Sequence, residues 1–246
     1  MDTVTWIPRA ETLDLTARHR QRLATVRREL GAERPAALLI GSAPPRYRSG
    51  HSRYRFRQSS DLFYLTGSNA EGLILLVSTE LKRPLLVAPP VDPVMVVWEG
   101  APEDVEALAG RLGCDLVRAA RPDEEILRRL HGTETLFFET ASDSAAYRIG
   151  REVLEAPADR RLALPQRFGN ADLVLAPLRL RKDADEVRAI RRAAKIAAEV
   201  LEECLPLLVP GIREFQFMEM MNAAMRVRGC EPSFDTIVAS GASAAT

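Results

Sequence analysis

The sequence predicts an α/β domain followed by a pair of long helices, and three observations support this fold class. Short apolar runs alternate with helical patterns up to about residue 176, as they do in α/β proteins. The segment 177–182 then changes in character, and a long amphipathic pattern follows it. We therefore predict a first domain at 1–176, a linker at 177–182 and a second domain at 183–246.

The first predicted helix covers residues 16–30. Leu23, Val26 and Leu30 recur at helical spacing, which places them on one face of that helix. Gly31 follows directly, and we predict that it ends the helix in the left-handed conformation, which glycine adopts without strain.

Three apolar runs are predicted to form a sheet that helices cover. The run 36–40 lies between a proline and a glycine and is too short for a helix, which favours a buried strand. The runs 73–77 and 85–88 flank a polar connection and are predicted to be neighbouring strands.

Two helices and two strands are predicted to complete the first domain. Pro102 and Pro122 are each followed by acidic residues, a pattern that is typical of the first turn of a helix. The runs 136–138 and 173–175 are predicted strands, which gives the alternation of an α/β domain.

The second domain is predicted to begin with two helices. Asp183 and Glu186 have the spacing of a capping box at the start of the first helix. The apolar face of that helix is predicted at Val187, Ile190, Ala194, Ala197, Leu201 and Leu205. The second helix is predicted to end near Gly229 and to carry an apolar face of Phe217, Met221, Ala224 and Met225. Residues 234–239 are predicted to form an exposed edge strand.

Composition gives no indication of a charged partner. Lys plus Arg and Asp plus Glu are each 34, so the formal net charge is zero and no global field attracts the chain to nucleic acid or to an anionic membrane. No run approaches the roughly 18 apolar residues that a membrane span needs. We predict neither a nucleic-acid partner nor membrane insertion.

The cysteines and the amino end indicate a cytoplasmic location. Cys114, Cys204 and Cys230 are odd in number and far apart, which argues against a disulfide framework or a zinc site. The first eight residues lack a basic segment followed by an apolar one, so we predict no export signal.

The sequence shows no metal or nucleotide motif. His19, His51 and His131 lie in the first domain, and none has metal spacing with another histidine or a carboxylate. There is no H-E-x-x-H, no P-loop and no complete G-x-G-x-x-G. We predict no catalytic residue and no metal ligand in this chain.

Three segments resemble the aminopeptidase P family. The segment from Arg57 to Gly67 is similar to the family's R-Q-x-S-D-F-x-Y-L-T-G signature. The segment 181–191 resembles R-x-x-K-x-x-x-E-[IV]-x-x-[IL]-R, slightly compressed, and 231–241 resembles the start of the family's catalytic domain.

That resemblance implies a fold, an activity and a pair of metal ions. In the family, an N-terminal α/β domain with a mixed sheet flanked by helices precedes an α+β pita-bread metallopeptidase domain. That domain removes the first residue from peptides whose second residue is proline, and it requires two divalent metals, usually manganese. The resemblance places the metal ligands, two Asp, one His and two Glu, beyond Thr246, so we expect residues 183–246 to be an incomplete pita-bread domain. Alone, the chain is expected to bind no metal and to be inactive.

The resemblance also singles out Trp98. It implies that Trp98 belongs to a segment that reaches the active site of a neighbouring subunit in a homo-oligomer and helps to wall the substrate pocket. From the residues alone, Trp98 could equally be a partly buried anchor under a loop.

The signature region supplies four further candidates, namely Arg55, Arg57, Asp61 and Tyr64. Arginines and aromatic residues alternate before the signature, which is typical of a nucleic-acid surface or of a structural or interfacial loop. The zero net charge favours the loop. Asp61 is predicted to cap the following backbone or to pair with Arg57, and Tyr64 to place its ring in the core with its hydroxyl bonded.

Two other readings of function stay open. A prolidase or creatinase relative would share the architecture. Alternatively, the chain is a non-catalytic assembly or binding module of the pita-bread family.

Overall fold

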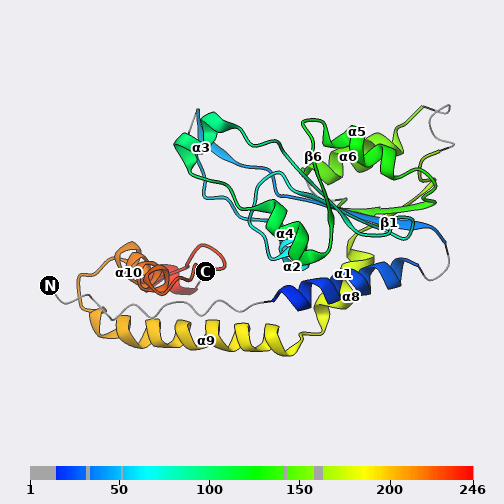
Figure 1. Ribbon diagram of the computed structural model, residues 1–246. Helices are drawn as coiled ribbons and strands as arrows, with labels where there is room; N and C mark the ends of the chain where they lie inside the picture. Colours follow the sequence, from blue (N-terminus) through cyan, green and yellow to red (C-terminus); the bar gives the residue numbers. More distant parts are fainter. Residues whose placement is uncertain (1–14, 32–33, 51, 141–142, 158–162, 246) are drawn as a thin grey trace. The chain divides into compact units, whose positions relative to one another are not determined.

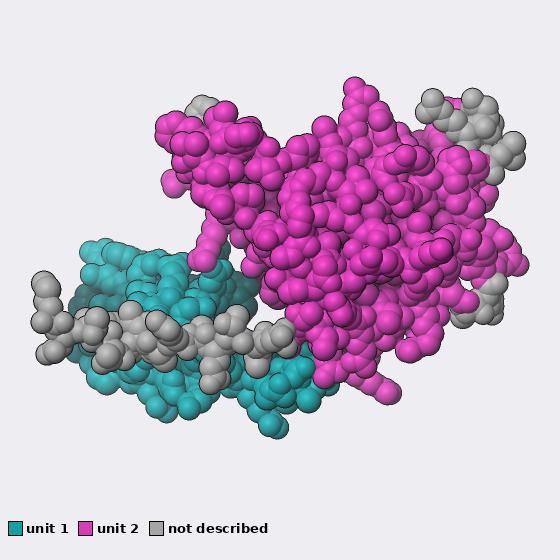
Figure 2. Space-filling model, viewed as in Figure 1, with its two compact units in different colours: residues 1–13, 182–246 teal, residues 14–181 magenta. Residues whose placement is uncertain are grey.

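The computed structural model describes residues 15–31, 34–50, 52–140, 143–157 and 163–245. The chain divides into two compact units, shown in two colours in Figure 2. Residues 14–181, magenta and numbered unit 2 in the key of the figure, are called the first unit because they come first in the described chain. Residues 182–246, which belong to the teal unit, are called the second. The predicted boundaries at 176 and 183 stay predictions.

A six-stranded mixed sheet forms the centre of the first unit, residues 14–181. Its order is β6-β5-β4-β1-β7-β8. Strand β4 is antiparallel to both β1 and β5, whereas β1 with β7, β7 with β8 and β5 with β6 are parallel pairs. The strands are β1 (Ala36–Gly41), β4 (Ile74–Ser78), β5 (Leu85–Ala88), β6 (Asp115–Arg118), β7 (Thr135–Phe138) and β8 (Arg167–Asn170).

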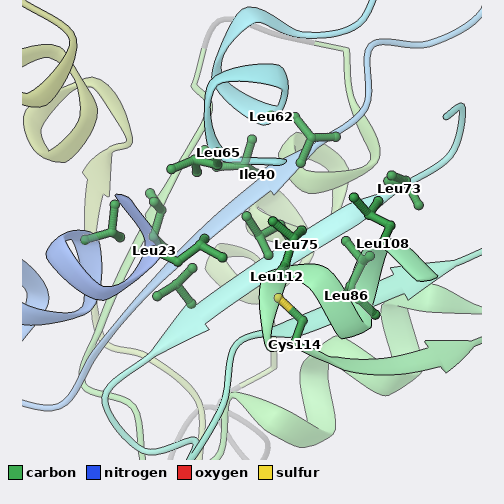
Figure 3. Close-up of a cluster of buried hydrophobic side chains, with 14 of the residues drawn as sticks. Leu23, Ile40, Leu62, Leu65, Leu73, Leu75, Leu86, Leu108, Leu112 and Cys114 are labelled. Carbon is green, nitrogen blue, oxygen red and sulfur yellow. The ribbon is translucent and has the colours of Figure 1, made fainter. Parts of the chain in front are cut away.

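Both faces of the sheet are covered by helices, because alternate residues of the central strands are apolar on both sides (Figure 1). Leu38 and Ile40 of β1 face one cluster, part of which is drawn in Figure 3, and Ala37 and Leu39 face the other. The first cluster includes residues of α1 (Thr16–Leu30), α2 (Ser60–Thr66), α4 (Val105–Leu112) and α8 (Asp172–Leu180). The second includes residues of α5 (Pro122–Arg129) and α6 (Ala145–Leu154).

Two further elements of the first unit carry no core residues. A short antiparallel hairpin joins β2 (Tyr47–Ser49) to β3 (Ser52–Arg53), and every residue in these strands is exposed. Helix α3 (Pro93–Glu99) contains no buried residue. The label α3 in Figure 1 marks its place at one end of the unit.

Most predicted elements of the first domain are confirmed, including helix 16–30 and the strands at 36–40, 73–77, 85–88 and 136–138. Pro122 is in the first turn of α5 as predicted. Pro102, however, lies before α4, which begins at Val105 because the carboxylate of Asp104 accepts a hydrogen bond from the amide of Ala107 (2.8 Å). The left-handed cap predicted at Gly31 is also wrong, since its φ is −83°.

The predicted strand at 173–175 is wrong, because these residues lie in α8. Leu175 is fully buried, whereas Leu173 is 69% exposed, so the run places its side chains in different directions around a helix. A three-residue apolar run does not distinguish the two structures. Residues 177–180 of the predicted linker also belong to α8.

The second unit is described at residues 182–245. It contains α9 (Ala184–Cys204), the short 3-10 helix η1 (Leu205–Leu207), α10 (Glu214–Val227) and η2 (Gly241–Ala245). The predicted capping box is confirmed, since Asp183 accepts from the amide of Glu186 (3.0 Å) while Glu186 accepts from the amide of Asp183 (2.9 Å).

The two long helices pack along a narrow seam. The predicted face of α10 is confirmed, because Phe217 is buried and Met221, Ala224 and Met225 pack against the same cluster. Gly229 follows α10 with a positive φ of 73°, as predicted. The predicted face of α9 is wrong, because the residues that meet α10 are Ile196, Val200 and Cys204. Residues 234–239 form no strand, and Phe234 and Ile237 are 70% and 82% exposed.

Candidate functional site

The signature segment contains a buried, hydrogen-bonded glutamine, Gln58, and then forms helix α2. Gln58 is 5% exposed and uses both ends of its amide. Its Nε2 donates to the Ala70 carbonyl (2.8 Å) and to Ser42 Oγ (3.1 Å). Its Oε1 accepts from the amides of Ala43 (3.2 Å) and Ser59 (2.9 Å). Gln58 therefore fixes the start of α2 to the end of β1, and burial costs it little because its hydrogen bonds are made.

Helix α2 has well-defined ends. The hydroxyl of Ser59 accepts a hydrogen bond from the amide of Leu62 (3.5 Å) at the N-terminus. Gly67 ends the helix with a φ of 69°, and a Cβ there would approach His19 Nε2 to 2.7 Å. The glycine that closes the signature is thus required by both backbone conformation and space.

Asp61 and Tyr64 lie on α2 and meet at Arg179 of α8. The carboxylate of Asp61 pairs with the Arg179 guanidinium, not with Arg57 as predicted. Capping by Asp61 is also wrong, since Ser59 is the N-cap. The Tyr64 ring packs against the core, and its hydroxyl donates to the Leu178 carbonyl (3.4 Å), which confirms the role expected for it.

Arg55 and Arg57 are exposed in the segment before α2. A neighbouring arginine, Arg53, links β3 to two acidic residues, Glu71 (3.2 Å) and Glu99 (3.5 Å). Its guanidinium also lies 5.3 Å from the ring centre of Tyr47, and the hydrogen bond to Tyr47 is the main reason that the pKa of Arg53 is raised. Part of the positive charge of the arginine-rich segment before α2 is therefore paired with carboxylates.

Trp98 lies on α3. Asp92 caps that helix by accepting from the amide of Val94 (2.8 Å), and Pro93 occupies its first turn. Trp98 and Val97 are each 81% exposed. The anchor role that the residues alone left open for Trp98 therefore does not fit this arrangement. We call α3 together with the hairpin β2–β3 the α3 arm, since Arg53 and Glu99 join them.

Glu139 is a functional-site candidate that sequence reasoning missed. It follows β7, and its carboxylate accepts from Ser144 Oγ (2.8 Å), Ser59 Oγ (3.1 Å) and the Gly41 amide (3.4 Å). Burial raises the pKa of the Glu139 carboxyl in spite of these donors, and nearby Asp61 adds to the increase. Its position directly after a strand was the available signal, because carboxyl ends of parallel strands meet at one edge.

The described residues do not fit a pair of divalent metals. No three His, Cys, Asp or Glu side chains in the described ranges stand together as metal ligands. His19 is buried with its Nδ1 3.0 Å from the Tyr64 carbonyl, and Glu139 is satisfied by its three donors. His131 is exposed, and His51 lies outside the described residues. We therefore derive no metal-dependent step from these side chains.

A hollow of about 430 Å³ lies at α5 and α6, apart from the signature and the α3 arm. Its lining mixes apolar residues with both signs of charge, and Arg151 pairs with Glu155 at its edge. None of the predicted site residues lines it. Among the helices that the structure describes, none combines the length and apolar character needed to cross a membrane.

Comparison with known families matches two successive parts of the chain. The model of the aminopeptidase P N-terminal domain matches residues 16–137, and that of metallopeptidase family M24 matches residues 188–246. The two matches have the order that the resemblance predicts.

The curated relatives of this chain include Xaa-Pro aminopeptidases. Xaa-Pro aminopeptidase of Escherichia coli is 27% identical over 214 residues, which cover 84% of this chain and 48% of that protein. A probable Xaa-Pro aminopeptidase of Fusarium vanettenii is 26% identical, covering 78% of this chain and 40% of that protein. The chain thus spans about half the length, or less, of these relatives.

Solved structures show the same fold. Aminopeptidase P from E. coli in its low pH form has a TM-score of 0.74 at 24% identity, covering 85% of this chain and 50% of that one. Aminopeptidase PepP of Pseudomonas aeruginosa has a TM-score of 0.76 at 20% identity, covering 87% and 49%. The predicted architecture, a mixed sheet flanked by helices before an incomplete catalytic domain, is confirmed.

Proposed function

The chain belongs to the aminopeptidase P family, and from that premise we propose that it is the N-terminal part of a Xaa-Pro aminopeptidase. The complete enzyme would remove the first residue from peptides with proline in second position, using two divalent metals, manganese by preference. The observation that carries this proposal is the ordered match of both family models along one chain. A solved E. coli aminopeptidase P is described with the inhibitor Pro-Leu, and another is zinc substituted and holds product.

We further propose that residues 1–246 are inactive alone. The coverage supports this, since the chain spans 48% of the E. coli relative. The test compares this chain with a longer one, if the reading frame continues past Thr246, on three substrates: an Xaa-Pro-Yaa tripeptide, an Xaa-Pro dipeptide and creatine.

With manganese added, only the longer chain is expected to release the first residue, and only from the tripeptide. Cleavage confined to the dipeptide or to creatine would instead assign a prolidase or a creatinase. An inactive longer chain that binds no manganese by calorimetry would favour the non-catalytic module. Activity of the 246-residue chain itself would refute its proposed inactivity.

We propose that the α3 arm is a subunit contact and that Trp98 walls the substrate pocket of a neighbouring subunit in a homo-oligomer. The support is the exposure of Trp98 and the absence of any buried residue in α3, which leave its apolar side chains to a partner. Arg55 and Arg57 lie in the exposed segment that follows the hairpin and are proposed to flank this contact.

Sedimentation velocity tests this contact. The Trp98→Ala variant is expected to shift towards smaller species, whereas Leu173→Ala, which truncates a 69% exposed side chain on α8, is expected to leave the distribution unchanged. Equal distributions for the parent chain and both variants would show that Trp98 is no subunit contact. The chain is also expected not to bind a single-stranded oligonucleotide at low or at high salt. Low salt is the stringent condition, because the affinity of basic side chains for nucleic acid falls steeply as salt rises.

We propose a cytoplasmic location. The three cysteines are free, and Cys114 and Cys204 are buried. Burial raises the pKa of the Cys114 thiol to about 12, so it stays protonated and serves as an apolar core residue. Secretion of the intact protein would contradict this proposal.

A further inference from the structure

The end of α8 is held by side chains of α2. The Arg179 guanidinium pairs with the Asp61 carboxylate, whose side chain is only 16% exposed. The Tyr64 hydroxyl donates to the carbonyl of Leu178 (3.4 Å). Carbonyls in the last turn of a helix have no partner within that helix, so Tyr64 meets a requirement that the end of α8 creates. A positive charge at this end, such as that of Arg179, also suits the helix dipole.

Tyr64 is in turn fixed by α1. The guanidinium of Arg22 lies 3.9 Å from the centre of the Tyr64 ring, and its Nη1 donates to the Tyr64 carbonyl (2.9 Å). Arg22 is 7% exposed, so its side chain is held in place by its surroundings. The Arg179 guanidinium lies 5.9 Å from the same ring centre, within the range of cation–π attraction. One tyrosine therefore joins three helices.

Apolar packing alone holds α8 less firmly towards its end. Leu175 is fully buried and Leu178 packs partly buried against the same cluster, but Leu180 is 76% exposed. Pro177 lies inside the helix and has no amide hydrogen to donate, which removes one hydrogen bond from the turn that precedes this end. The polar contacts with α2 therefore add to a limited apolar packing at the end of α8.

The contact between α2 and the end of α8 lies next to the connection between the two units. Only residues 181–183 lie between the end of α8 and the start of α9. If the last turn of α8 opened, the flexible connection would grow by about three residues, or roughly 10 Å of reach. A closed last turn therefore limits where the chain can leave the first unit.

We propose that Asp61, Tyr64 and Arg179 form a latch that closes the end of α8 and so restricts the movement of the second unit relative to the first. In the complete enzyme these would be positioning residues, because they act through α8 and not on substrate. That consequence rests on the proposed function, whereas the latch does not. Hydrogen exchange and distance measurements on the 246-residue chain test the latch without any cleavage assay, so the two proposals can fail separately.

The first measurement is hydrogen exchange at the amides of 178–181 in the 246-residue chain. Asp61→Asn and Arg179→Gln are each expected to accelerate this exchange roughly two- to fivefold, the range for a partly exposed ion pair. The double variant is expected to resemble the single ones, because both remove the same contact. Tyr64→Phe, which deletes only the hydroxyl, is expected to give a smaller increase.

The second measurement is the distribution of distances between two spin labels. The labels are placed at Ala107→Cys in α4 and Glu202→Cys in α9, both exposed, with Cys230 replaced by serine. Asp61→Asn and Arg179→Gln are expected to broaden the distribution. Arg151→Gln is the matched control, since it removes an arginine–carboxylate pair elsewhere in the first unit and is expected to change neither measurement.

The protection of β1 amides serves as the reference for folding in every variant. Unchanged exchange at 178–181 in Asp61→Asn and Arg179→Gln would show that no latch exists. Faster exchange with an unchanged distance distribution would show that the contact stabilises α8 without restricting the second unit, and would also overturn the proposal.

Discussion

The two units of this chain differ in how much apolar surface they bury. In the first, the strands β1, β4 and β5 are buried on both faces, and helices supply a core on each side. In the second, Val200, Cys204 and Phe217 are the buried apolar residues among those described. Phe215, Phe234 and Ile237 are 58%, 70% and 82% exposed. Regular helices thus form in both units, but a two-sided core forms only in the first, and tertiary packing supplies most helix stability.

The largest expected effect of this difference is in hydrogen exchange. We predict that amides of β1 and β4 are protected on the order of a thousandfold or more above those of α9 and α10, because core amides exchange only through global unfolding. Native-state exchange followed by mass spectrometry measures both sets in one sample. Equal protection in the two units would show that the second is as stable as the first.

Truncation of one leucine in each unit sharpens the comparison. Leu75→Ala removes a fully buried side chain from β4 and is expected to cost about 2–5 kcal/mol of unfolding free energy. Leu205→Ala removes a side chain that is 50% exposed and is expected to change it by less than about 0.5 kcal/mol. Guanidinium unfolding followed by circular dichroism gives both values. A cost for Leu205→Ala near that of Leu75→Ala would reveal packing around η1.

Two glycines test whether close packing extends to the helices of the first unit. A Cβ at Gly150 of α6 would lie 2.3 Å from the Phe138 ring, so Gly150→Ala is expected to destabilise the chain by about 1–3 kcal/mol. A Cβ at Gly110 of α4 meets no atom within 4 Å, so Gly110→Ala is expected to stabilise it by about 0.5–1 kcal/mol. The same unfolding experiment checks both. A stabilising Gly150→Ala would contradict the packing at Phe138, and a destabilising Gly110→Ala would contradict the open space at α4.

The sequence predicted the strands that are buried on both faces, because a continuous apolar run is a strong signal when it is flanked by turns. It did not predict β6 and β8, since Asp115–Arg118 and Arg167–Asn170 are short and partly polar strands at the two edges of the sheet. Each of these two strands forms because it pairs in parallel with a neighbouring strand. The local sequence pattern contains no information on that pairing.

The site shows the same division between local and distant information. Ser59 and Gly67 are understandable from their neighbours, since capping and helix termination act over a few residues. The partner of Asp61 lies 118 residues away, so a prediction from nearby sequence selected Arg57 and missed Arg179. The family signature identified Asp61 and Tyr64 as important residues, but only the fold supplied their contacts.

The smallest expected effect concerns two carboxyls with opposite surroundings. The pKa of Glu139 is raised by burial, so the folded chain binds this proton more tightly than the unfolded chain does. Its contribution to stability is present below the ordinary glutamate pKa of about 4.3 and is lost as pH rises through the raised folded value. Glu106 is the opposite case, because its hydrogen bond with Arg118 lowers its pKa. Its contribution is present above the ordinary value and is lost as pH falls.

Unfolding midpoints measured from about pH 2, well below the ordinary glutamate pKa of about 4.3, to neutrality should separate these signs. Relative to the parent chain, Glu139→Gln is expected to lose less stability as pH rises, because the buried charge is gone. Glu106→Gln is expected to lose less as pH falls, because it has no ionised pair to break. A slope for Glu139→Gln that equals the slope of the parent chain would mean that burial at the end of β7 does not disfavour the Glu139 charge. The polar contacts of Ser59 and Ser144 would then be sufficient to hold a carboxylate there.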